Sequence, residues 1–279
     1  MKSRFRTFLF LVPFLLFLAA CGGGGSSAPD EPQLVTKTLG CTDWLSVTTP
    51  VGRLSNNVWN KQAAGTFNPT QCLEQRVDGN SLQYGWSWNW PASSNAIFAY
   101  PEIVVGAKPW EPGPGNDARF PRQVSATNRM LVSYDAEVTT TGVHNLAASI
   151  WLINTPTVAN PPVTSNVVTE MMIWTRSTTF NPGGSYRGNV VIDGVEWEVW
   201  AAENWGDNSG ANANRWTYIA YRAVKPALAI TFDARKLMAD AAGRGLLSTS
   251  SYIADVELGN EIMSGSGTTF LKSFSVTID

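Results

Sequence analysis

Short segments in which apolar and polar residues alternate recur along the second half of the chain. A two-residue period puts successive side chains on opposite faces of an extended strand, so each segment predicts a β-strand. Clusters of Gly, Pro, Asn and Asp lie between the segments, as turns between strands require. The predicted strands cover residues 131–140, 146–153, 169–174, 196–201, 216–224, 252–258 and 270–278.

One segment has the spacing of a helix instead. Asp233 is a suitable N-cap, and residues 234–245, which follow it, place Leu237 and Ala241 on one helical face. Many short strands with a single helix, in a chain of 279 residues, favour one all-β domain. We expect a two-sheet sandwich of the jelly-roll type.

The N-terminus follows a different pattern. Basic residues among the first six positions precede an apolar run, 8–20, that is short for a membrane-spanning helix. The run ends in small residues and Cys21, and a segment rich in Gly, Ser and Pro follows. This order resembles a bacterial lipoprotein signal, after which Cys21 carries the lipid. An ordinary secretory signal with an incidental cysteine is the alternative.

These observations divide the chain into three parts and predict export. The parts are a signal peptide (1–20), the lipidated Cys21 with a flexible tether (21–36) and the jelly-roll domain (37–279). Gly22 lacks the acidic character associated with retention in an inner membrane. We therefore expect a lipid anchor at the outer membrane or cell surface, or else secretion, with no other contact to a membrane.

The composition narrows the choice of ligand. Charged residues make up only 15% of the chain, the net charge is −2, and the basic residues are dispersed, so nothing attracts nucleic acid. Twelve Trp, seven Tyr and twelve Phe are a heavy aromatic load for this length. Many of these rings fill a β core, and the others suit stacking on the flat faces of sugars.

Few residue types remain for catalysis. His144 is the only histidine, which excludes a His-rich metal site. Of the three cysteines, Cys21 is consumed by the lipid, and an exported protein is expected to pair Cys41 with Cys72. No dinucleotide-binding or P-loop motif is present, so we expect no cofactor and no metal. Carboxylates are left for acid–base chemistry at neutral pH, and glycosidic bond cleavage requires two of them.

One candidate carboxylate is Glu170 in the predicted strand TEMMIW (169–174). Alternation places Glu170, Met172 and Trp174 on the same face of this strand. An arbitrary strand glutamate is most often a solvent-facing residue. Here the neighbouring apolar side chains favour a site.

A second carboxylate is expected from DVELGNEIMSGSG (255–267). Alternation assigns one face of this segment to the core and the other to Asp255, Glu257, Glu261 and Met263. Spacing alone does not distinguish Glu257 from Glu261. The core face is assigned to Val256, Leu258 and Ile262.

Six segments in this order resemble glycoside hydrolase family 12, over essentially the whole domain. They are NNVWN (56–60), AYPEIVVG (99–106), TEMMIW (169–174), GVEWEVWA (194–201), WTYIAYR (216–222) and GNEIMSGSG with FSVTI (259–278). The resemblance implies a jelly roll of two curved antiparallel sheets with a concave substrate cleft. It also implies a retaining endo-β-1,4-glucanase, and some members of the family are specific for xyloglucan. We further expect a monomer that acts without a cofactor.

The same resemblance assigns roles to individual residues. It makes Glu170 the nucleophile and Glu261 the general acid/base. Trp59 resembles the indole that stacks on a sugar on the non-reducing side of the cut, and Asn57 is expected to hydrogen-bond a hydroxyl. The further residues assigned to substrate binding are Met172 and Trp174, as the cleft floor, together with Ser149 and Glu257. Cys41 and Cys72 fall where bacterial members carry an N-terminal cysteine pair.

One position departs from the family pattern. Relatives usually carry an Asp before the I-W-L run, where this chain has Ser149. That Asp is thought to share a hydrogen bond with the nucleophile. We expect the Ser149 hydroxyl to donate to an ionised Glu170 and to lower the pKa of Glu170. Weaker activity, a shifted pH optimum or a binding-only member of the family are the possible consequences.

Two other classes of function fit part of the same residues. A carbohydrate-binding module or lectin would use the aromatic residues without Glu170 and Glu261. A surface lipoprotein with a structural or adhesive role would need neither the aromatic residues nor the two glutamates. The choice among cellulose-type glucan, mixed-linkage glucan and xyloglucan depends on two long loops, 107–122 and 154–166.

Overall fold

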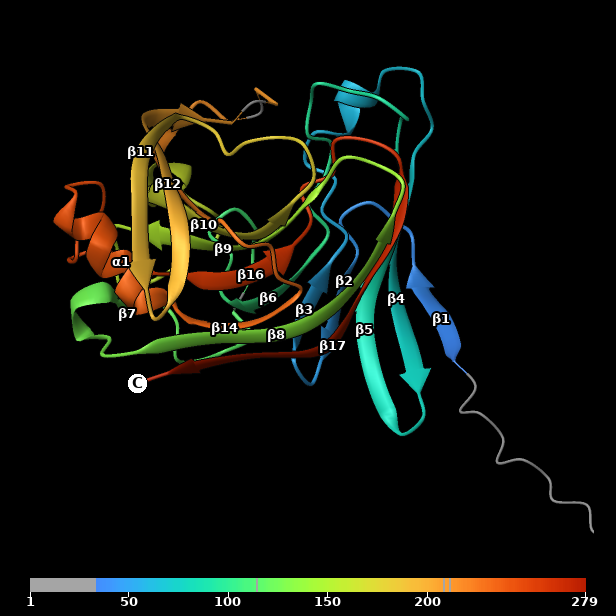
Figure 1. Ribbon diagram of the computed structural model, residues 1–279, viewed down its shortest axis with the longest axis horizontal. Coiled ribbons are helices and arrows are strands. Elements are labelled where there is room, and N and C mark those ends of the chain that lie inside the picture. Colours follow the sequence, from blue (N-terminus) through green and yellow to red (C-terminus); the bar gives the residue numbers. More distant parts are fainter. Residues whose placement is uncertain (1–33, 114, 208, 211) are drawn as a thin grey trace, which may run out of the picture. The chain divides into compact units, whose positions relative to one another are not determined.

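The strands form two sheets that face each other across one hydrophobic core (Figure 1). The computed structural model describes residues 34–279 except 114, 208 and 211, and Leu34–Asp279 form one compact unit. The sequence assigned residues 35 and 36 to the tether, but both pair with the second strand of the smaller sheet. The predicted lipidation site, Cys21, lies outside the described residues.

The smaller sheet has six strands. In spatial order they are β1 (Val35–Gly40), β4 (Thr70–Asp78), β5 (Ser81–Asn89), β17 (Ser266–Ile278), β8 (Met130–Thr140) and β14 (Ala229–Asp233). Strands β8 and β17 cover the predicted segments 131–140 and 270–278 and pair along almost their whole length.

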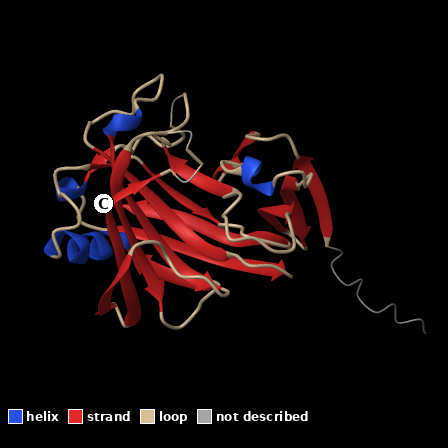
Figure 2. Ribbon diagram, turned by 90° about the horizontal axis from the view of Figure 1, so that it is seen from above, coloured by secondary structure: helices blue, strands red, loops and turns tan. Residues whose placement is uncertain are grey.

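The larger sheet has eleven strands, and two of these are short strands beside the main path of the sheet. In spatial order its main strands are β11 (Ser185–Ile192), β12 (Val195–Gly206), β13 (Arg215–Ala223), β10 (Val167–Ser177), β9 (Asn145–Ile153), β16 (Asp255–Gly259), β6 (Glu102–Gly106), β3 (Gly52–Ser55) and β2 (Ser46–Thr49). The side strands are β7 (Arg122–Gln123) and β15 (Tyr252–Ile253). The remaining predicted strands therefore all lie in this sheet, and the all-β sandwich is confirmed (Figure 2).

Helices are few in the described part of the chain. The predicted helix is α1 (Ala234–Gly243), and its N-cap Asp233 accepts a hydrogen bond from the backbone N–H of Arg235. Leu237 and Ala241 are buried as expected, and α1 packs against β8. No described helix is long and apolar enough to cross a membrane. The short 3-10 helices are η1 (Lys61–Ala64), η2 (Val124–Ala126) and η3 (Thr164–Asn166).

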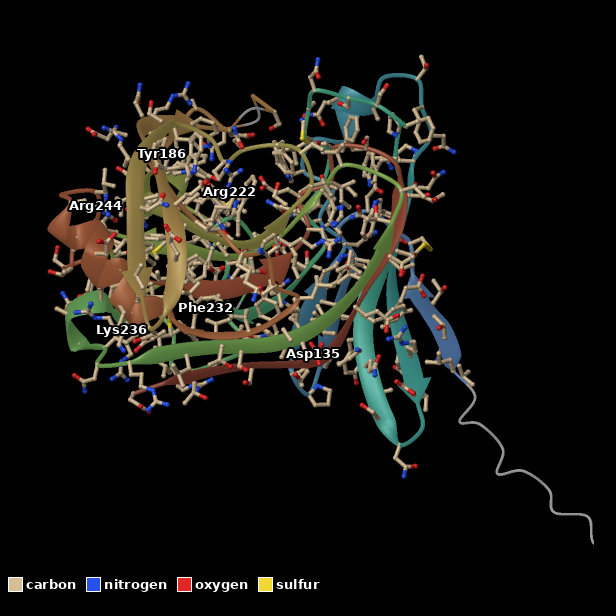
Figure 3. The ribbon with its side chains drawn as sticks, viewed as in Figure 1. Asp135, Tyr186, Arg222, Phe232, Lys236 and Arg244 are labelled. Atoms are coloured by element: carbon tan, nitrogen blue, oxygen red, sulfur yellow. A yellow bond between two sulfur atoms is a disulfide. The ribbon has the colours of Figure 1, made fainter. Side chains whose placement is uncertain are left out.

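One apolar cluster fills the space between the sheets. Phe232 of β14, for example, lies against Trp197 of β12 with ring centroids 6.0 Å apart (Figure 3). The predicted core face of β16 is confirmed, because Val256 and Leu258 are fully buried in the cluster together with Ile262. Other members include Trp86, Val132, Ile150, Met171 and Tyr221.

Strands β10 and β13 pair in parallel, and all other pairs among the described strands are antiparallel. Because β11 also runs parallel to β10, the loop from residue 178 to 184 must return along the sheet before β11 begins. Gly183 and Gly184 make this path possible. A side chain at Gly183 would meet the Trp205 ring, and Gly184 has a φ of +81°, which favours glycine.

The predicted disulfide joins Cys41 to Cys72, with Cα atoms 4.0 Å apart. Cys41 directly follows β1 and Cys72 lies in β4. The bond therefore holds the first strand of the smaller sheet next to its neighbour.

Candidate active site

A cavity of about 570 Å³ lies on the face of the larger sheet that points away from the core. Strands β9, β10 and β13 form its floor, and the 178–184 loop and the β12–β13 connection contribute to its walls. The loops 107–122 and 154–166 also contribute residues, as the sequence suggested. The cavity is lined by all eight residues predicted for catalysis or substrate binding: Asn57, Trp59, Ser149, Glu170, Met172, Trp174, Glu257 and Glu261.

Strand register places Glu170 at the centre of this floor. Glu170 lies opposite Trp151 of β9 on one side and Tyr218 of β13 on the other. Its Oε2 accepts a hydrogen bond of 2.9 Å from the indole Nε1–H of Trp216. An indole N–H can only donate, so this bond favours the ionised carboxylate. Trp216 belongs to the predicted strand 216–224, but the sequence did not identify it as a site residue.

Burial raises the pKa of Glu170 to about 8. The hydrogen bond from Trp216 opposes this shift, and the carboxylates of Glu261 and Glu257 add to it. Lys108 has the smallest influence and lowers the pKa. Glu170 therefore lies in an environment that resists ionisation and close enough to Glu261 to feel its charge.

Glu261 follows β16 and is fixed by Asn145, the first residue of β9. The Asn145 Nδ2–H donates to Glu261 Oε2, and Asn145 Oδ1 accepts from the Glu261 backbone N–H at 2.8 Å. Burial raises the pKa of Glu261 to about 7, and the Asn145 hydrogen bond opposes this. Asn145 directly precedes the predicted strand 146–153, and no sequence motif marked it.

The prediction that the Ser149 hydroxyl donates a hydrogen bond to Glu170 is wrong. Register places Ser149 opposite Met172 of β10, not opposite Glu170, and opposite Glu257 of β16 on its other side. The short Ser149 side chain does not reach Glu170, and its buried Oγ has no hydrogen-bond partner among the described residues. The hydroxyl therefore does not lower the pKa of Glu170, and Trp216 supplies the donor instead.

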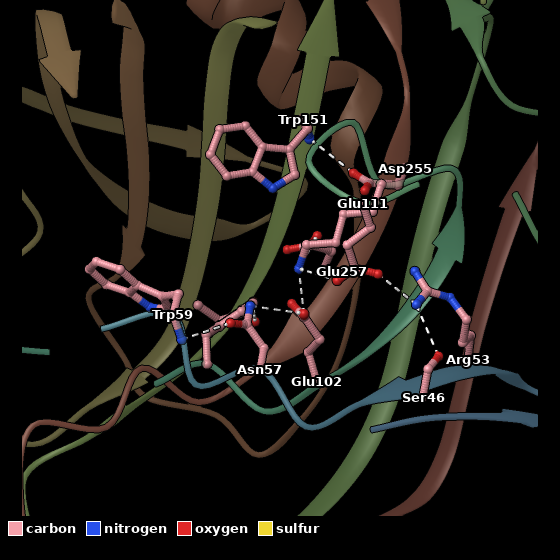
Figure 4. A network of polar contacts seen from close by, with 12 residues as sticks. Ser46, Arg53, Asn57, Trp59, Glu102, Glu111, Trp151, Asp255 and Glu257 are labelled. Atoms are coloured by element: carbon pink, nitrogen blue, oxygen red, sulfur yellow. Dashed lines mark hydrogen bonds and ion pairs between the residues drawn. The ribbon is translucent and has the colours of Figure 1, made fainter. Parts of the chain in front are cut away.

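Asn57 and Trp59 lie at one end of the cavity. Asn57 Oδ1 accepts from the Trp59 backbone N–H at 3.1 Å, and Asn57 Nδ2 donates to the buried Glu102 at 3.2 Å (Figure 4). The Asn57 amide thus connects the Trp59 backbone to a residue of β6. The Trp59 ring lines the cavity.

The floor beside Glu170 is apolar. Met172 and Trp174 are almost fully buried, and the Met172 sulfur accepts from the Trp174 indole at 3.5 Å and the Tyr218 hydroxyl at 3.6 Å. Phe180 of the returning loop packs on Trp174 with centroids 4.9 Å apart. These contacts hold the floor rigid, which keeps Glu170 in one position.

A cluster of three tryptophans forms the wall next to Glu170. The rings of Trp110, Trp151 and Trp216 lie 5.0 to 5.6 Å apart, pairwise, in tilted and edge-on arrangements. The indole nitrogens of Trp110 and Trp151 are buried without a hydrogen-bond partner in the part of the chain that the structure describes. Such donors suit hydroxyl groups of a ligand.

A group of charged side chains lies close to Trp151 on the same side of the cavity (Figure 4). The Lys108 ammonium contacts Glu102, Glu257 at 3.0 Å and Glu111 at 3.8 Å. Arg53 forms a further ion pair with Glu111 at 2.7 Å. Burial, followed by the charge of Glu257, raises the pKa of Glu102 well above its usual value. The sequence did not indicate Lys108 or Glu102, because their partners come from other strands.

Other acid–base chemistry has little support at this site. His144 is buried and does not line the cavity, and burial lowers its pKa. Across residues 34–279, leaving aside 114, 208 and 211, no group of three or more His, Cys, Asp or Glu side chains is arranged to hold a metal ion. The carboxyls of Glu170 and Glu261 remain the best-placed pair.

Comparison with known proteins agrees with this geometry. Residues 52–279 match the model of glycosyl hydrolase family 12. The chain is 27% identical to endoglucanase S of Pectobacterium parmentieri over 81% of each chain, and 21% identical to a xyloglucan-specific endo-β-1,4-glucanase of Emericella nidulans over 85% of this chain and 90% of the relative.

Solved structures share the fold. A family 12 xyloglucanase from Bacillus licheniformis with bound ligand aligns with a TM-score of 0.74 and 25% identity, covering 88% of this chain and all of the other. An endoglucanase from Rhodothermus marinus aligns with a TM-score of 0.67 and 27% identity, covering 88% and 99% of the two chains.

Proposed function

The chain belongs to glycosyl hydrolase family 12, and we propose that it is a retaining endo-acting hydrolase of β-1,4-glucans. The family and its endoglucanase and xyloglucanase relatives support a glycoside hydrolase with endoglucanase activity. The single observation that supports the mechanism is that two half-buried carboxyls, Glu170 and Glu261, line one cavity beside a cluster of tryptophan rings.

In the first step the ionised Glu170 attacks the anomeric carbon and forms a glycosyl ester. The glycosidic C–O bond breaks as Glu261 gives its proton to the leaving oxygen. In the second step Glu261 takes a proton from water, the water oxygen bonds to the anomeric carbon, and the ester to Glu170 breaks. The products are two shorter glucans, and both carboxyls return to their starting states.

This mechanism needs one proton shared by two carboxyls. With pKa values of about 8 for Glu170 and about 7 for Glu261, the pair holds roughly one proton between pH 7 and 8. In the free enzyme this proton lies mainly on Glu170, whose pKa is the higher of the two even with the Trp216 hydrogen bond, so the reactive form, with Glu170 ionised and the proton on Glu261, is the minor one. The positive charge that develops on the sugar favours this form in the transition state. Below this range both carboxyls are protonated, and above it both are ionised. We expect a bell-shaped dependence of kcat/KM with its maximum between about pH 7 and 8.

Cellulose-type glucan, mixed-linkage glucan and xyloglucan are the proposed substrates. A glucan would lie across the floor, stack on Trp59 at one end and pass over Met172 and Trp174. The Trp110 indole and the charged side chains next to Glu257 would contact sugar hydroxyls.

The test follows the stereochemistry and size of the products. Proton NMR of a digest should show the β-anomer first, as retention requires, with a mixture of oligosaccharides typical of internal cleavage. A panel of tamarind xyloglucan, barley glucan and amorphous cellulose would identify the preferred chain. Initial release of the α-anomer would contradict double displacement.

A non-catalytic glucan-binding protein on the same fold is the alternative, because Ser149 departs from the family pattern. That protein would be retarded in gels containing xyloglucan or carboxymethylcellulose but would release no reducing sugar. A purely structural or adhesive protein would show neither effect.

We also propose that the protein is a monomer. We further propose that it is lipid-anchored through Cys21 at the cell envelope, and this proposal rests on the signal-like N-terminus alone. Metabolic labelling with a fatty acid tests the anchor. Label should enter the wild-type chain and be lost in Cys21→Ser. Equal labelling of both would refute the anchor without affecting the proposed enzyme activity.

A further inference from the structure

An ion pair is buried beside the cleft, where unpaired charges are costly. The Lys108 ammonium lies 3.0 Å from the Glu257 carboxylate, and the two side chains are 6% and 2% exposed (Figure 4). Taking two charges out of water is costly, and a buried ion pair is often no more stabilising than apolar residues of the same volume. Both residues line the same cavity as Glu170. This location raises the question of what the pair acts on.

Strand register shows how close Glu257 comes to the proposed nucleophile. Glu257 of β16 lies directly opposite Ser149 of β9, and Ser149 lies opposite Met172, two residues from Glu170 on β10. Directly paired residues present their side chains to the same face. The small Ser149 side chain, whose hydroxyl has no partner within the described residues, therefore lies between Glu257 and Met172. Trp151, the next residue of β9 on this face, lies directly opposite Glu170.

The other charged groups near Glu257 come from several elements. The Glu102 carboxyl belongs to β6, and Asp255 belongs to β16 itself. Burial, with Glu257 as the next cause, raises the pKa of both, so both resist carrying charge. Glu111 is paired with Arg53 on the far side of Lys108. The other titratable groups that interact with Glu257 are Tyr100 and Glu170.

We propose that Lys108 and Glu257 are a positioning pair that sets the charge state of the Glu170 carboxyl, with Lys108 favouring its ionisation and Glu257 opposing it. The inference rests on the proposed role of Glu170 as nucleophile. The directions have an independent basis, because the charge of Glu257 raises the pKa of Glu170 and the charge of Lys108 lowers it. Both act across a cleft floor of low polarity, where charges interact more strongly than in water. Neither residue touches the reacting atoms in this role.

Opposite signs distinguish this role from a structural one. A pair that only stabilised the fold would lower activity in the same way whichever partner was removed. A pair that sets the charge on Glu170 moves the alkaline limb of kcat/KM in opposite directions, because that limb follows the higher pKa of the two carboxyls, which is that of Glu170.

The experiment measures kcat/KM against pH on a soluble β-glucan for the full chain and its variants. Glu257→Gln should move the alkaline limb to lower pH by about half a unit or more, and Lys108→Met should move it to higher pH. The matched control is Glu74→Gln, which removes a buried carboxyl of β4 in the other sheet, bonded to Ser87. Its profile should match that of the wild type.

A double variant covers the case in which Lys108→Met does not fold. Ser149→Asp combined with Glu257→Gln moves the carboxylate one strand across, to the residue directly opposite. Its alkaline limb should return toward the wild-type position, above that of Glu257→Gln alone. A purely structural Glu257 leaves the limb of Glu257→Gln unmoved, so there is then no shift for Ser149→Asp to reverse.

The inference fails if the limb of Glu257→Gln stays within about 0.2 units of the wild type, or if it moves in the same direction as that of Lys108→Met. The proposed function fails in a different way, through a wild type without activity or a Glu170→Gln variant with normal turnover. The two failures are therefore distinguishable in one set of measurements.

Discussion

The two faces of β10 are both largely covered and yet have different purposes. Met171 and Ile173 are fully buried in the hydrophobic core, whereas Glu170 on the other face is half-buried. Glu170 and Met172 point into the cavity, where carboxyls, indoles and an ammonium lie close together. The same alternation that builds the sandwich therefore also builds the cleft.

The comparison shows that burial alone does not mark a site. The core face leaves few polar atoms to satisfy, so its side chains can only stabilise the fold. The cavity face holds buried polar atoms without partners among the described residues, on Ser149, Trp110 and Trp151. On a cavity face such atoms are open to hydrogen bonds with water or with polar groups of a ligand. Substitutions on the two faces should therefore affect different measurements.

The largest effect is expected from Glu170→Gln on the cavity face. Loss of the nucleophile should lower kcat by a factor on the order of 10⁴ or more. Stability should not fall. Glu170 holds its proton to about pH 8 in the folded chain but only to about 4.5 when unfolded, so folding stability decreases as the pH rises through this window. The variant has no carboxyl to deprotonate at this position, so it does not lose folding stability in this way. Its thermal midpoint at pH 8 should equal or exceed that of the wild type. Retention of substantial turnover would assign the nucleophile elsewhere.

A smaller loss is expected for Glu261→Gln. Removal of a general acid and base lowers rates by roughly 10²- to 10⁴-fold. The deficit should shrink on aryl glucosides with good leaving groups, because these need little protonation, and the alkaline limb of the pH profile should disappear. A deficit that is the same for every leaving group would argue against the assignment.

On the core face, Met171→Ala should act on stability. Deleting this fully buried side chain should cost about 2 to 5 kcal/mol of unfolding free energy, measured by urea denaturation. The kcat of the molecules that remain folded should change little. Val191→Ala is the control, since Val191 is 66% exposed and its loss should matter by less than about 0.5 kcal/mol. A large fall in kcat with unchanged stability would contradict the division between the faces.

Strands such as β8 and β12 could be predicted from the sequence, because buried and exposed positions alternate along them. The strands before residue 130, together with β11 and β14, were not predicted. In β6 all five residues are buried, so there is no alternation to detect, and β4 buries the charged side chains of Glu74 and Arg76. Charged residues normally indicate an exposed face.

The residues of the site also divide into those that the sequence identified and those that it did not. Glu170 and Glu261 were identified because each lies in a recognisable local segment. Trp216 was not identified as a partner of Glu170, because their contact depends on the parallel register of β10 and β13, which sequence order does not reveal. Lys108 lies in a loop that has no periodicity, and its three acidic contacts come from β6, β16 and its own loop. Short-range patterns carry no information on such pairings.

The smallest effect, and the finest test of the cavity face, concerns Trp216. Trp216→Phe keeps an aromatic ring in the three-tryptophan cluster but removes the N–H that donates to Glu170. This hydrogen bond lowers the pKa of Glu170, so its loss should raise that pKa and move the alkaline limb of kcat/KM to higher pH, by about half a unit to one unit. The matched control is Trp110→Phe in the same cluster, because the Trp110 indole N–H has no partner in the described part of the chain. If both variants shift the limb equally, the cause is packing of the cluster, and the hydrogen bond does not set the charge on Glu170.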